Sequence, residues 1–401
     1  AADAHFNRLR VWGGGIVNKE AFYDICEELG VMVWSEFPLA CLPYADDDAY
    51  LEVLEAEATA IVRRVRSHAS NVMWCGGNEL FNSWSGMTDQ SKALRLLNAI
   101  CYRLDPDTPF LPTSPVHGMG HGPYLFREPD GAEIYQTFAE SDCTAYTEFG
   151  CPGPAPVKVL RSFIPENELW PPQRDTAWES HHAFGAWAYG TVSTWLCPEI
   201  TQHYFGEQTS LEDLVEKGQW LQAEGFKFIY EESRRQKPVC SMALNWCFNE
   251  PWPTAANNSL ISWPDEPKPS YHAVKSACRP VSLSARIRGF QWRNGDGFEA
   301  ELWLLNDRWE TVAPSDVHAT LRIGDGRSRI LTWHCPGAAP NTNAKGPAIS
   351  MELPRVAAAS ELFLHVEAPE QPEWKQIYRL SYRPDRQPKA YGVTARKGLN
   401  V

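Results

Sequence analysis

Several short apolar segments of this sequence end in side chains that can take part in chemistry. The apolar run Val72–Cys75 is followed by two glycines and then by Asn78 and Glu79, and Glu148 ends another apolar run. A carboxylate that follows an apolar strand is costly to bury unless it is paired or used. For Glu79, the alternative interpretation is a structural ion pair with Arg10.

The two glutamates, Glu79 and Glu148, suit one kind of chemistry. Cleavage of a glycosidic bond with retention of configuration needs two carboxyl groups about 5 to 5.5 Å apart, one to attack the anomeric carbon and one to protonate the leaving oxygen. The two residues are 69 positions apart (148 minus 79), a span that strand–helix units can fill, so both side chains could face one pocket. Spacing alone leaves open which of them is the acid.

The elements that must position these side chains alternate short apolar strands with amphipathic helices over the first 280 residues, a pattern typical of parallel β/α units. Strands are predicted at 6–12, 31–37, 72–75, 110–112, 124–126, 145–149 and 239–246, and helices at 19–29, 50–67, 90–104 and 211–236. The predicted fold class is α/β, a (β/α)₈ TIM-type barrel. Its first strand is missing from this chain and would precede residue 1.

The sequence after Cys278 has a different texture. Short alternating runs such as 298–306, 319–323 and 361–366 are separated by Gly, Pro, Asn and Asp, which is typical of an all-β, immunoglobulin-like sandwich. Prolines cluster at 264–280, which we predict to be the linker between two domains. We therefore predict a catalytic domain at 1–278 and a sandwich at 279–401.

Composition argues against several classes of partner. The formal net charge is -13 and no basic stripe is present, which argues against nucleic acid and anionic membranes. No apolar stretch of about 18 residues predicts a membrane span. Eleven cysteines without a C-x-x-C pair leave at least one thiol unpaired and favour a reducing, cytoplasmic compartment. Export stays open, because the sequence begins as though an upstream portion were missing.

Five motifs, in order along the chain, resemble the strand ends of glycoside hydrolase family 2, and its β-mannosidase-like branch in particular. They are Asn7–Gly15, Gly30–Phe37, Trp74–Glu79, Thr147–Gly150 and Asn245–Pro253. The resemblance implies a retaining, exo-acting β-glycosidase that works by double displacement on a β-linked glycoside. It makes Glu79 the proton donor and Glu148 the nucleophile.

The same resemblance suggests how the substrate is held. Asn78 would hydrogen-bond the sugar 2-hydroxyl, and Arg10 is a cation that, with the mutual repulsion of the two glutamates, can separate their pKa values. Other substrate-binding candidates are Trp12, Trp84, Trp246, Asn249 and Trp252, with core packing as the alternative for the tryptophans.

We expect no cofactor and no metal ion. Asp46–Asp48 is interpreted as a helix cap and not as a calcium loop.

Three departures from the family pattern matter. The segment 122–128 lacks the His-x-Trp element of the β-mannosidases, so β-glucosaminidase, β-galactosidase and β-glucuronidase specificities stay open. Glu250 stands where the family has Asp. The N-terminal domains and first barrel strand are absent, so we expect the N-terminal portion of the same enzyme, in cis or as a separate chain, to be a partner. A non-catalytic carbohydrate-binding subunit or fragment is the alternative.

Overall fold

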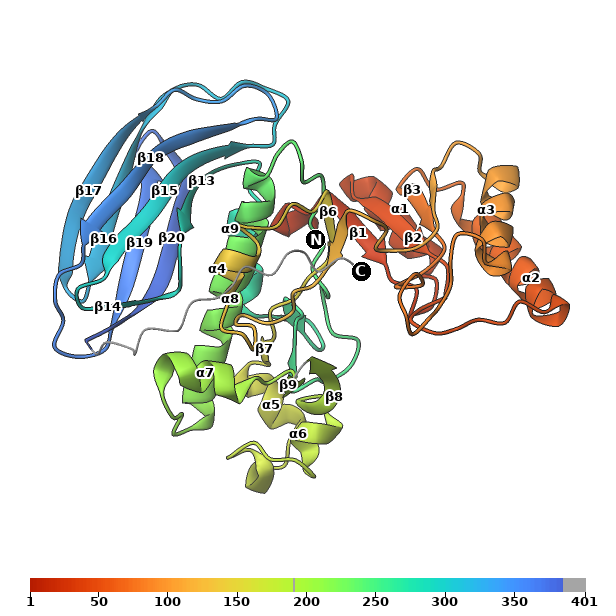
Figure 1. Cartoon of the computed structure of the whole chain (residues 1–401), viewed down its shortest axis with the longest axis horizontal. Coiled ribbons are helices and arrows are strands. Elements are labelled where there is room, and N and C mark those ends of the chain that lie inside the picture. Colours follow the sequence, from red (N-terminus) through yellow and green to blue (C-terminus); the bar gives the residue numbers. More distant parts are fainter. Residues whose placement is uncertain (190–191, 385–401) are drawn as a thin grey trace. The chain divides into compact units, whose positions relative to one another are not determined.

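The computed structural model describes residues 1–189 and 192–384 (Figure 1). Within these residues the chain forms two compact units. Unit 1 contains residues 1–121 and 143–147, and unit 2 contains 122–142 and the described residues from 148 onward. The predicted domains, 1–278 and 279–401, divide the chain differently, and their boundary stays a prediction.

Unit 1 is built on a parallel sheet in the strand order β1-β2-β3-β4. Its strands are β1 (Arg8–Val11), β2 (Met32–Glu36), β3 (Asn71–Cys75) and β4 (Phe110–Leu111), and the helices along it are α1 (Glu20–Leu29), α2 (Asp48–Val65) and α3 (Lys92–Leu104). Figure 1 shows these elements in red and orange. Parallel pairing brings the carboxyl ends of all four strands to one edge of the sheet, which is where the polar motifs lie.

The helices of unit 1 form where the sequence predicts them. In α2 the buried residues Leu54, Ala58 and Val62 recur at intervals of four, so one face of the helix packs on the sheet. Asp47 caps this helix, since its side chain accepts a hydrogen bond from the backbone N–H of Tyr50 at 3.0 Å. The capping role expected of Asp46–Asp48 is therefore confirmed.

No barrel is closed among the described residues. The strands β5 (Met119–His121) and β6 (Ala145–Glu148) form a separate two-stranded sheet. The strand predicted at 124–126 is wrong, because this segment is irregular, and the segment 239–246 contains a bridge at residue 243 but no extended strand. Leu125 and Phe126 are nonetheless fully or almost fully buried. An apolar run can therefore be buried by side-chain packing alone, without its backbone pairing with a neighbouring strand.

Unit 2 contains the remaining short elements. These are α4 (Ile134–Thr137), β7 (Gly153–Pro154), α5 (Val157–Phe163), α6 (Ala177–Ser180), β8 (Phe184–Tyr189), β9 (Val192–Thr194), α7 (Pro198–Phe205), α8 (Leu211–Arg235), β10 (Ala256–Asn257), β11 (Ile261–Ser262), β12 (Glu266–Pro267) and α9 (Pro269–Ala277), with 3₁₀ turns at Glu166–Glu168 here and at Ala2–Ala4 in unit 1. The short elements before α8 pack around Trp178 and Trp195.

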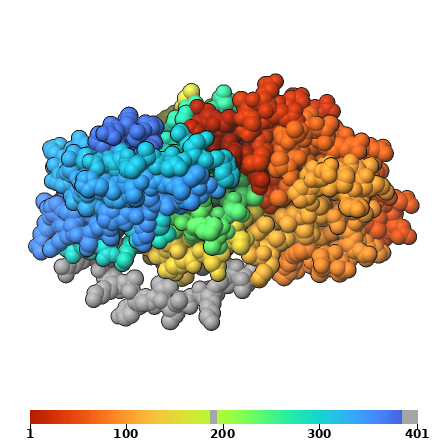
Figure 2. Space-filling model, turned by 90° about the horizontal axis from the view of Figure 1, so that it is seen from above, coloured from red at the N-terminus to blue at the C-terminus, as the bar shows by residue number. Residues whose placement is uncertain are grey.

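The all-β texture predicted after Cys278 corresponds to two sheets of unit 2. One has the order β13-β15-β18 and the other β14-β20-β19-β16-β17. The strands are β13 (Val281–Ile287), β14 (Gln291–Arg293), β15 (Gly297–Asn306), β16 (Ser315–Ile323), β17 (Gly326–Cys335), β18 (Asn343–Glu352), β19 (Ser360–Ala368) and β20 (Gln371–Arg383). Their residues form the cyan-to-blue surface in Figure 2.

Buried charges tie the long helix α8 to these sheets. The guanidinium of Arg235 donates to Glu232 at 2.8 Å, and the Tyr378 hydroxyl donates to Glu231 at 2.7 Å. Arg286 of β13 reaches the same Glu232 at 2.6 Å. The side chains of Glu231, Glu232 and Arg235 are fully buried, and removing one partner would leave a buried charge unpaired. The sheets and α8 are therefore parts of one packed unit.

Candidate active site

Arg10 on β1 is the centre of a polar network in unit 1. It donates from Nε to Oε1 of Glu36 at 2.7 Å, from Nη2 to Oδ1 of Asn78 at 2.6 Å, and from Nη1 to the backbone carbonyl of Thr147 at 3.3 Å. The side chains of Arg10 and Glu36 are 6% and 0% exposed. The structural ion pair considered for Glu79 is thus made by Glu36 instead.

The backbone beyond β3 places Asn78 and Glu79 at the edge of the sheet. Asn78 bridges to Ala40 on one side and to Ser114 on the other, so the parallel pairing continues past the end of β3. A Cβ on Gly77 would lie 2.3 Å from the carbonyl oxygen of Leu39, and its φ is 152°, so only glycine fits there. Glu79 itself has a φ of 53°, a left-handed conformation that is strained for a non-glycine residue and is common at functional sites.

Both carboxylate oxygens of Glu79 have partners within unit 1. Oε1 lies 2.8 Å from Nδ1 of His121, and Oε2 accepts from the thiol of Cys41 at 3.4 Å. His121 is fixed in turn through Nε2, which lies 3.0 Å from the hydroxyl of Ser114. The side chain of Glu79 is 22% exposed, whereas that of His121 is 4% exposed. A partly accessible carboxyl held by an imidazole can exchange a proton with a bound molecule.

Glu148 of unit 2 has a different environment. It is 5% exposed, and its Oε2 accepts a 2.6 Å hydrogen bond from the Tyr124 hydroxyl. The backbone carbonyl of Glu148 accepts from the N–H of Gly122 at 3.0 Å, which brings the segment carrying Tyr124 close to Glu148. A hydroxyl that donates to a carboxylate at this distance makes a strong, charge-assisted bond.

Reasoning from sequence missed Cys41, His121 and Tyr124 as neighbours of the predicted residues. A signal existed for two of them. His121 immediately precedes the segment 122–128, where the family pattern has a His-x-Trp element, and Tyr124 lies inside that segment. Glu36, the partner of Arg10, is the last residue of β2 and lies inside the Gly30–Phe37 motif. For Cys41 the sequence carried no signal, because its contact depends on the backbone course after β2.

The predicted aromatic residues are distributed over both units. In unit 1, Trp12 is half-buried against Gly14, where a Cβ would lie 1.9 Å from the indole ring, and Trp84 is 59% exposed. In unit 2, Trp246 is half-buried and Trp252 is 41% exposed. The structure thus gathers Arg10, Asn78 and Glu79 in unit 1, and the separation between Glu79 and Glu148 stays a prediction.

The loop that carries Asn249 and Trp252 is held by a buried ion pair. Asn249 is exposed, and the Trp252 ring stacks on His181 with 5.5 Å between ring centroids. The neighbouring Glu250 is buried, lies 3.3 Å from the ammonium of Lys268 and accepts the backbone N–H of Trp263 at 3.2 Å. Burial lowers the pKa of Lys268. The Glu that replaces the family Asp is therefore an anchor of this loop.

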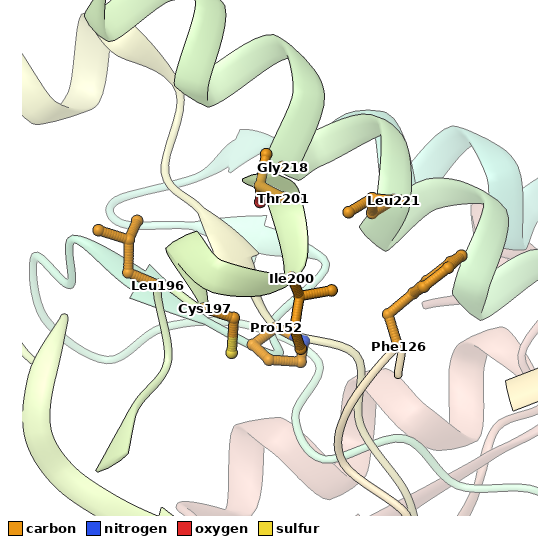
Figure 3. Close-up of a pocket in the computed structure, with 8 residues that line it drawn as sticks. All are labelled: Phe126, Pro152, Leu196, Cys197, Ile200, Thr201, Gly218 and Leu221. Carbon is orange, nitrogen blue, oxygen red and sulfur yellow. The ribbon is translucent and has the colours of Figure 1, made fainter. Parts of the chain in front are cut away.

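The molecule has two further features that resemble sites, an apolar pocket and a cluster of titratable side chains. Figure 3 shows a pocket against α7 and α8 that is lined mainly by apolar side chains such as Leu196, Ile200 and Leu221, and it has no charged group for catalysis. On unit 1, Nδ1 of His68 lies 3.5 Å from Asp24 and 3.3 Å from Glu27, a set that could hold a divalent cation. Neither feature includes a predicted site residue.

Among the described residues, no helix is long and apolar enough to cross a membrane. None of the eleven cysteines, all of which are described, takes part in a disulfide.

Comparison with known proteins gives consistent matches. The chain is 27% identical over 368 residues to Beta-mannosidase B of Neosartorya fischeri, covering 80% of this chain and 42% of that protein. It is 29% identical over 316 residues to Beta-mannosidase B of Thermothelomyces thermophilus, covering 70% of this chain and 36% of that protein. The chain thus spans less than half the length of these curated relatives. No family model matches.

Solved structures share the fold. The Beta-D-Mannosidase of Dictyoglomus thermophilum superposes with a TM-score of 0.76 and 24% identity, covering 95% of this chain and 46% of that one. The exo-chitosanase of Amycolatopsis orientalis gives a TM-score of 0.68 and 16% identity, covering 94% of this chain and 45% of that one. The resemblance to β-mannosidase-like glycoside hydrolases of family 2, predicted from the motifs, is confirmed by the relatives and structures together.

Proposed function

We propose that this chain carries the catalytic residues of a retaining, exo-acting β-glycosidase of the β-mannosidase type. The observation that carries the proposal is the environment of Glu79, a partly exposed carboxyl held between His121 and Cys41 next to an Asn78 that Arg10 fixes. The alignment with proteins named Beta-mannosidase B over most of this chain supports the same activity.

The chemistry proceeds in two displacements. Glu148 attacks the anomeric carbon while Glu79 gives its proton to the leaving oxygen, and a glycosyl-enzyme forms. Glu79 then takes a proton from water, which attacks the same carbon and releases the sugar. The hydroxyl of Tyr124 donates to Oε2 of Glu148 and so orients this carboxylate.

The substrate is held through groups that the site leaves available. The side-chain carbonyl of Asn78 accepts a hydrogen bond from Arg10, and one of its amide hydrogens is donated to Cys41. The second amide hydrogen can therefore be donated to the sugar 2-hydroxyl. We assign the walls of the sugar subsite to the remaining candidates. They are Trp12, Trp84, Trp246, Asn249 and Trp252.

The finer fold proposal is a (β/α)₈ barrel at 1–278 with an immunoglobulin-like sandwich at 279–401. Among the described residues β1 pairs with β2 alone, and its first three residues are only half-buried, which supports a further strand beside it. The N-terminal portion of the same enzyme, in cis or as a separate chain, would supply this strand. An isolated chain 1–401 that matches the complete polypeptide in turnover would contradict this requirement.

The test is a panel of aryl β-glycosides given to the complete polypeptide that carries this sequence. The panel contains the β-mannoside, β-glucoside, β-galactoside, β-glucosaminide and β-glucuronide, and we expect the β-mannoside to be hydrolysed fastest. A different preferred sugar would correct the specificity and keep the mechanism. Sugar binding without turnover of any member would contradict the enzyme and favour a carbohydrate-binding subunit.

A further inference from the structure

We infer that Cys41 is a positioning residue for Glu79, a role that rests on the proposed function. Cys41 follows β2, and its backbone N–H donates to the carbonyl oxygen of Asn78 at 3.0 Å. Its φ of 54° is left-handed, as is that of Glu79. Cys41 and Glu79 therefore both adopt the left-handed conformation beyond neighbouring strands, and their side chains contact each other.

The directions of the two thiol contacts follow from the chemistry of the partners. The amide nitrogen of Asn78 lies 3.2 Å from Sγ and can only donate, so the sulfur accepts there. The S–H hydrogen is then available to Oε2 of Glu79 at 3.4 Å. Cys41 thus links the residue expected at the sugar 2-hydroxyl to the residue expected at the leaving oxygen.

A chain of hydrogen bonds leads from a fixed cation to the carboxyl. Arg10, paired with buried Glu36, donates to the carbonyl of Asn78, and the amide of Asn78 donates to Cys41. Each donor in such a chain polarises the next, which strengthens the final bond. The thiol therefore transmits part of the polarisation caused by the Arg10 cation to Glu79, although the thiol itself is neutral.

A neutral partner suits a carboxyl that must act as both acid and base. A thiol can donate to the ionised carboxylate and can accept from the protonated acid, so it stays in contact through both displacements. A lysine or arginine in its place would favour the ionised form alone. With His121 on Oε1 and Cys41 on Oε2, both oxygens of Glu79 stay oriented in either state.

The inference is tested by comparing leaving groups. Cys41→Ala and Cys41→Ser are made in the complete polypeptide, and kcat/KM is measured for the phenyl and 2,4-dinitrophenyl β-glycosides of the preferred sugar. Phenol needs a proton as it leaves, whereas dinitrophenolate does not. We expect Cys41→Ala to lose about tenfold on the phenyl glycoside and less than about twofold on the dinitrophenyl glycoside, because only acid catalysis is impaired. Cys41→Ser should recover most of the loss, since its hydroxyl also donates and accepts.

The matched control is Cys26→Ala, which removes a buried thiol from α1, and it should leave both kcat/KM values unchanged. Equal losses on the two substrates, or no loss on either, would overturn the inference. If Cys41→Ala does not fold, Cys41→Val takes its place because it also removes both bonds, and a ratio of the two substrates equal to that of the unaltered polypeptide would overturn the inference. An unaltered polypeptide that hydrolyses neither substrate would instead refute the proposed function, and the inference would fall with it.

Discussion

Glu79 lies beyond the end of β3 and Glu148 is the last residue of β6, and the structure gives the two carboxyl groups opposite surroundings. Glu79 is partly exposed and meets an imidazole and a thiol, which can both donate and accept. Glu148 is buried and meets a tyrosine hydroxyl that donates to it. Partners that can both donate and accept suit an acid/base such as Glu79, which must exchange protons. A hydroxyl that donates suits a nucleophile such as Glu148, which must attack as a carboxylate. The difference supports the acid/base and nucleophile roles.

The largest effect should come from removing either glutamate. We expect Glu148→Ala to lower kcat on an aryl β-glycoside by at least about 10⁴-fold, since the glycosyl-enzyme can no longer form. Azide should restore turnover with an inverted glycosyl azide as product. Glu79→Ala should lose less on good leaving groups, and its azide product should have retained configuration. Product stereochemistry, measured by NMR, checks the roles, and the opposite pattern would exchange them.

The network around Glu79 can be broken through Arg10. Arg10→Met leaves the fully buried Glu36 without its cation, so we expect the free energy of unfolding to fall by about 3 to 5 kcal/mol. Urea denaturation of the complete polypeptide measures it. The double variant Arg10→Met, Glu36→Gln should recover part of the loss because no charge stays unpaired. An Arg10→Met variant of unchanged stability would mean that the ion pair is not buried as described.

The environment of Glu148 can be tested through Tyr124. Tyr124→Phe removes the hydroxyl that donates to Oε2, and we expect kcat/KM to fall by about 10- to 100-fold, the usual value of one hydrogen bond to a charged group. The control is Tyr102→Phe, which alters a side chain that is 79% exposed. Equal activity of the two variants would show that Glu148 does not need the donor.

A third carboxyl, Glu128, sharpens the comparison because it lies in the same segment as Tyr124 without an equivalent donor. Its Oε1 is buried with no hydrogen-bond partner among the described residues. Burial raises the pKa of Glu128 to about 7, and the charge of Asp130 adds to the rise. A raised pKa in the folded state means that stability is greatest below the ordinary pKa of 4.5 and is lost as pH rises through about 7.

Glu128→Gln should therefore match the unaltered protein near pH 4.5 and exceed it at pH 8 by about 2 kcal/mol in the free energy of unfolding. Urea denaturation at several pH values checks this. Glu370→Gln, at an exposed position in the turn before β20, serves as the control and should show no such trend. A difference that does not change with pH would contradict the assignment to Glu128.

Much of unit 1 could be predicted from the sequence. The period of Leu54, Ala58 and Val62 specifies a helix against a sheet, and Asp47 marks where that helix begins. Strands β1 to β4 follow from apolar runs, and parallel pairing then brings their ends to one edge. The position of Asn78 and Glu79 at this edge follows from the apolar run of β3 that precedes them. The strand predicted at 124–126 failed because its apolar side chains are buried by packing and not by strand pairing, whereas 239–246 forms only a bridge at residue 243 and has an exposed Val239.

By itself, then, the sequence determined which residues follow the strands and which family they resemble. Only the tertiary structure decided what those residues touch. Glu36 and not Glu79 pairs with Arg10, and Cys41 reaches both Asn78 and Glu79. The physical reason is that strand ends are set by local periodicity, whereas side-chain partners depend on register and on backbone turns between segments far apart in the chain.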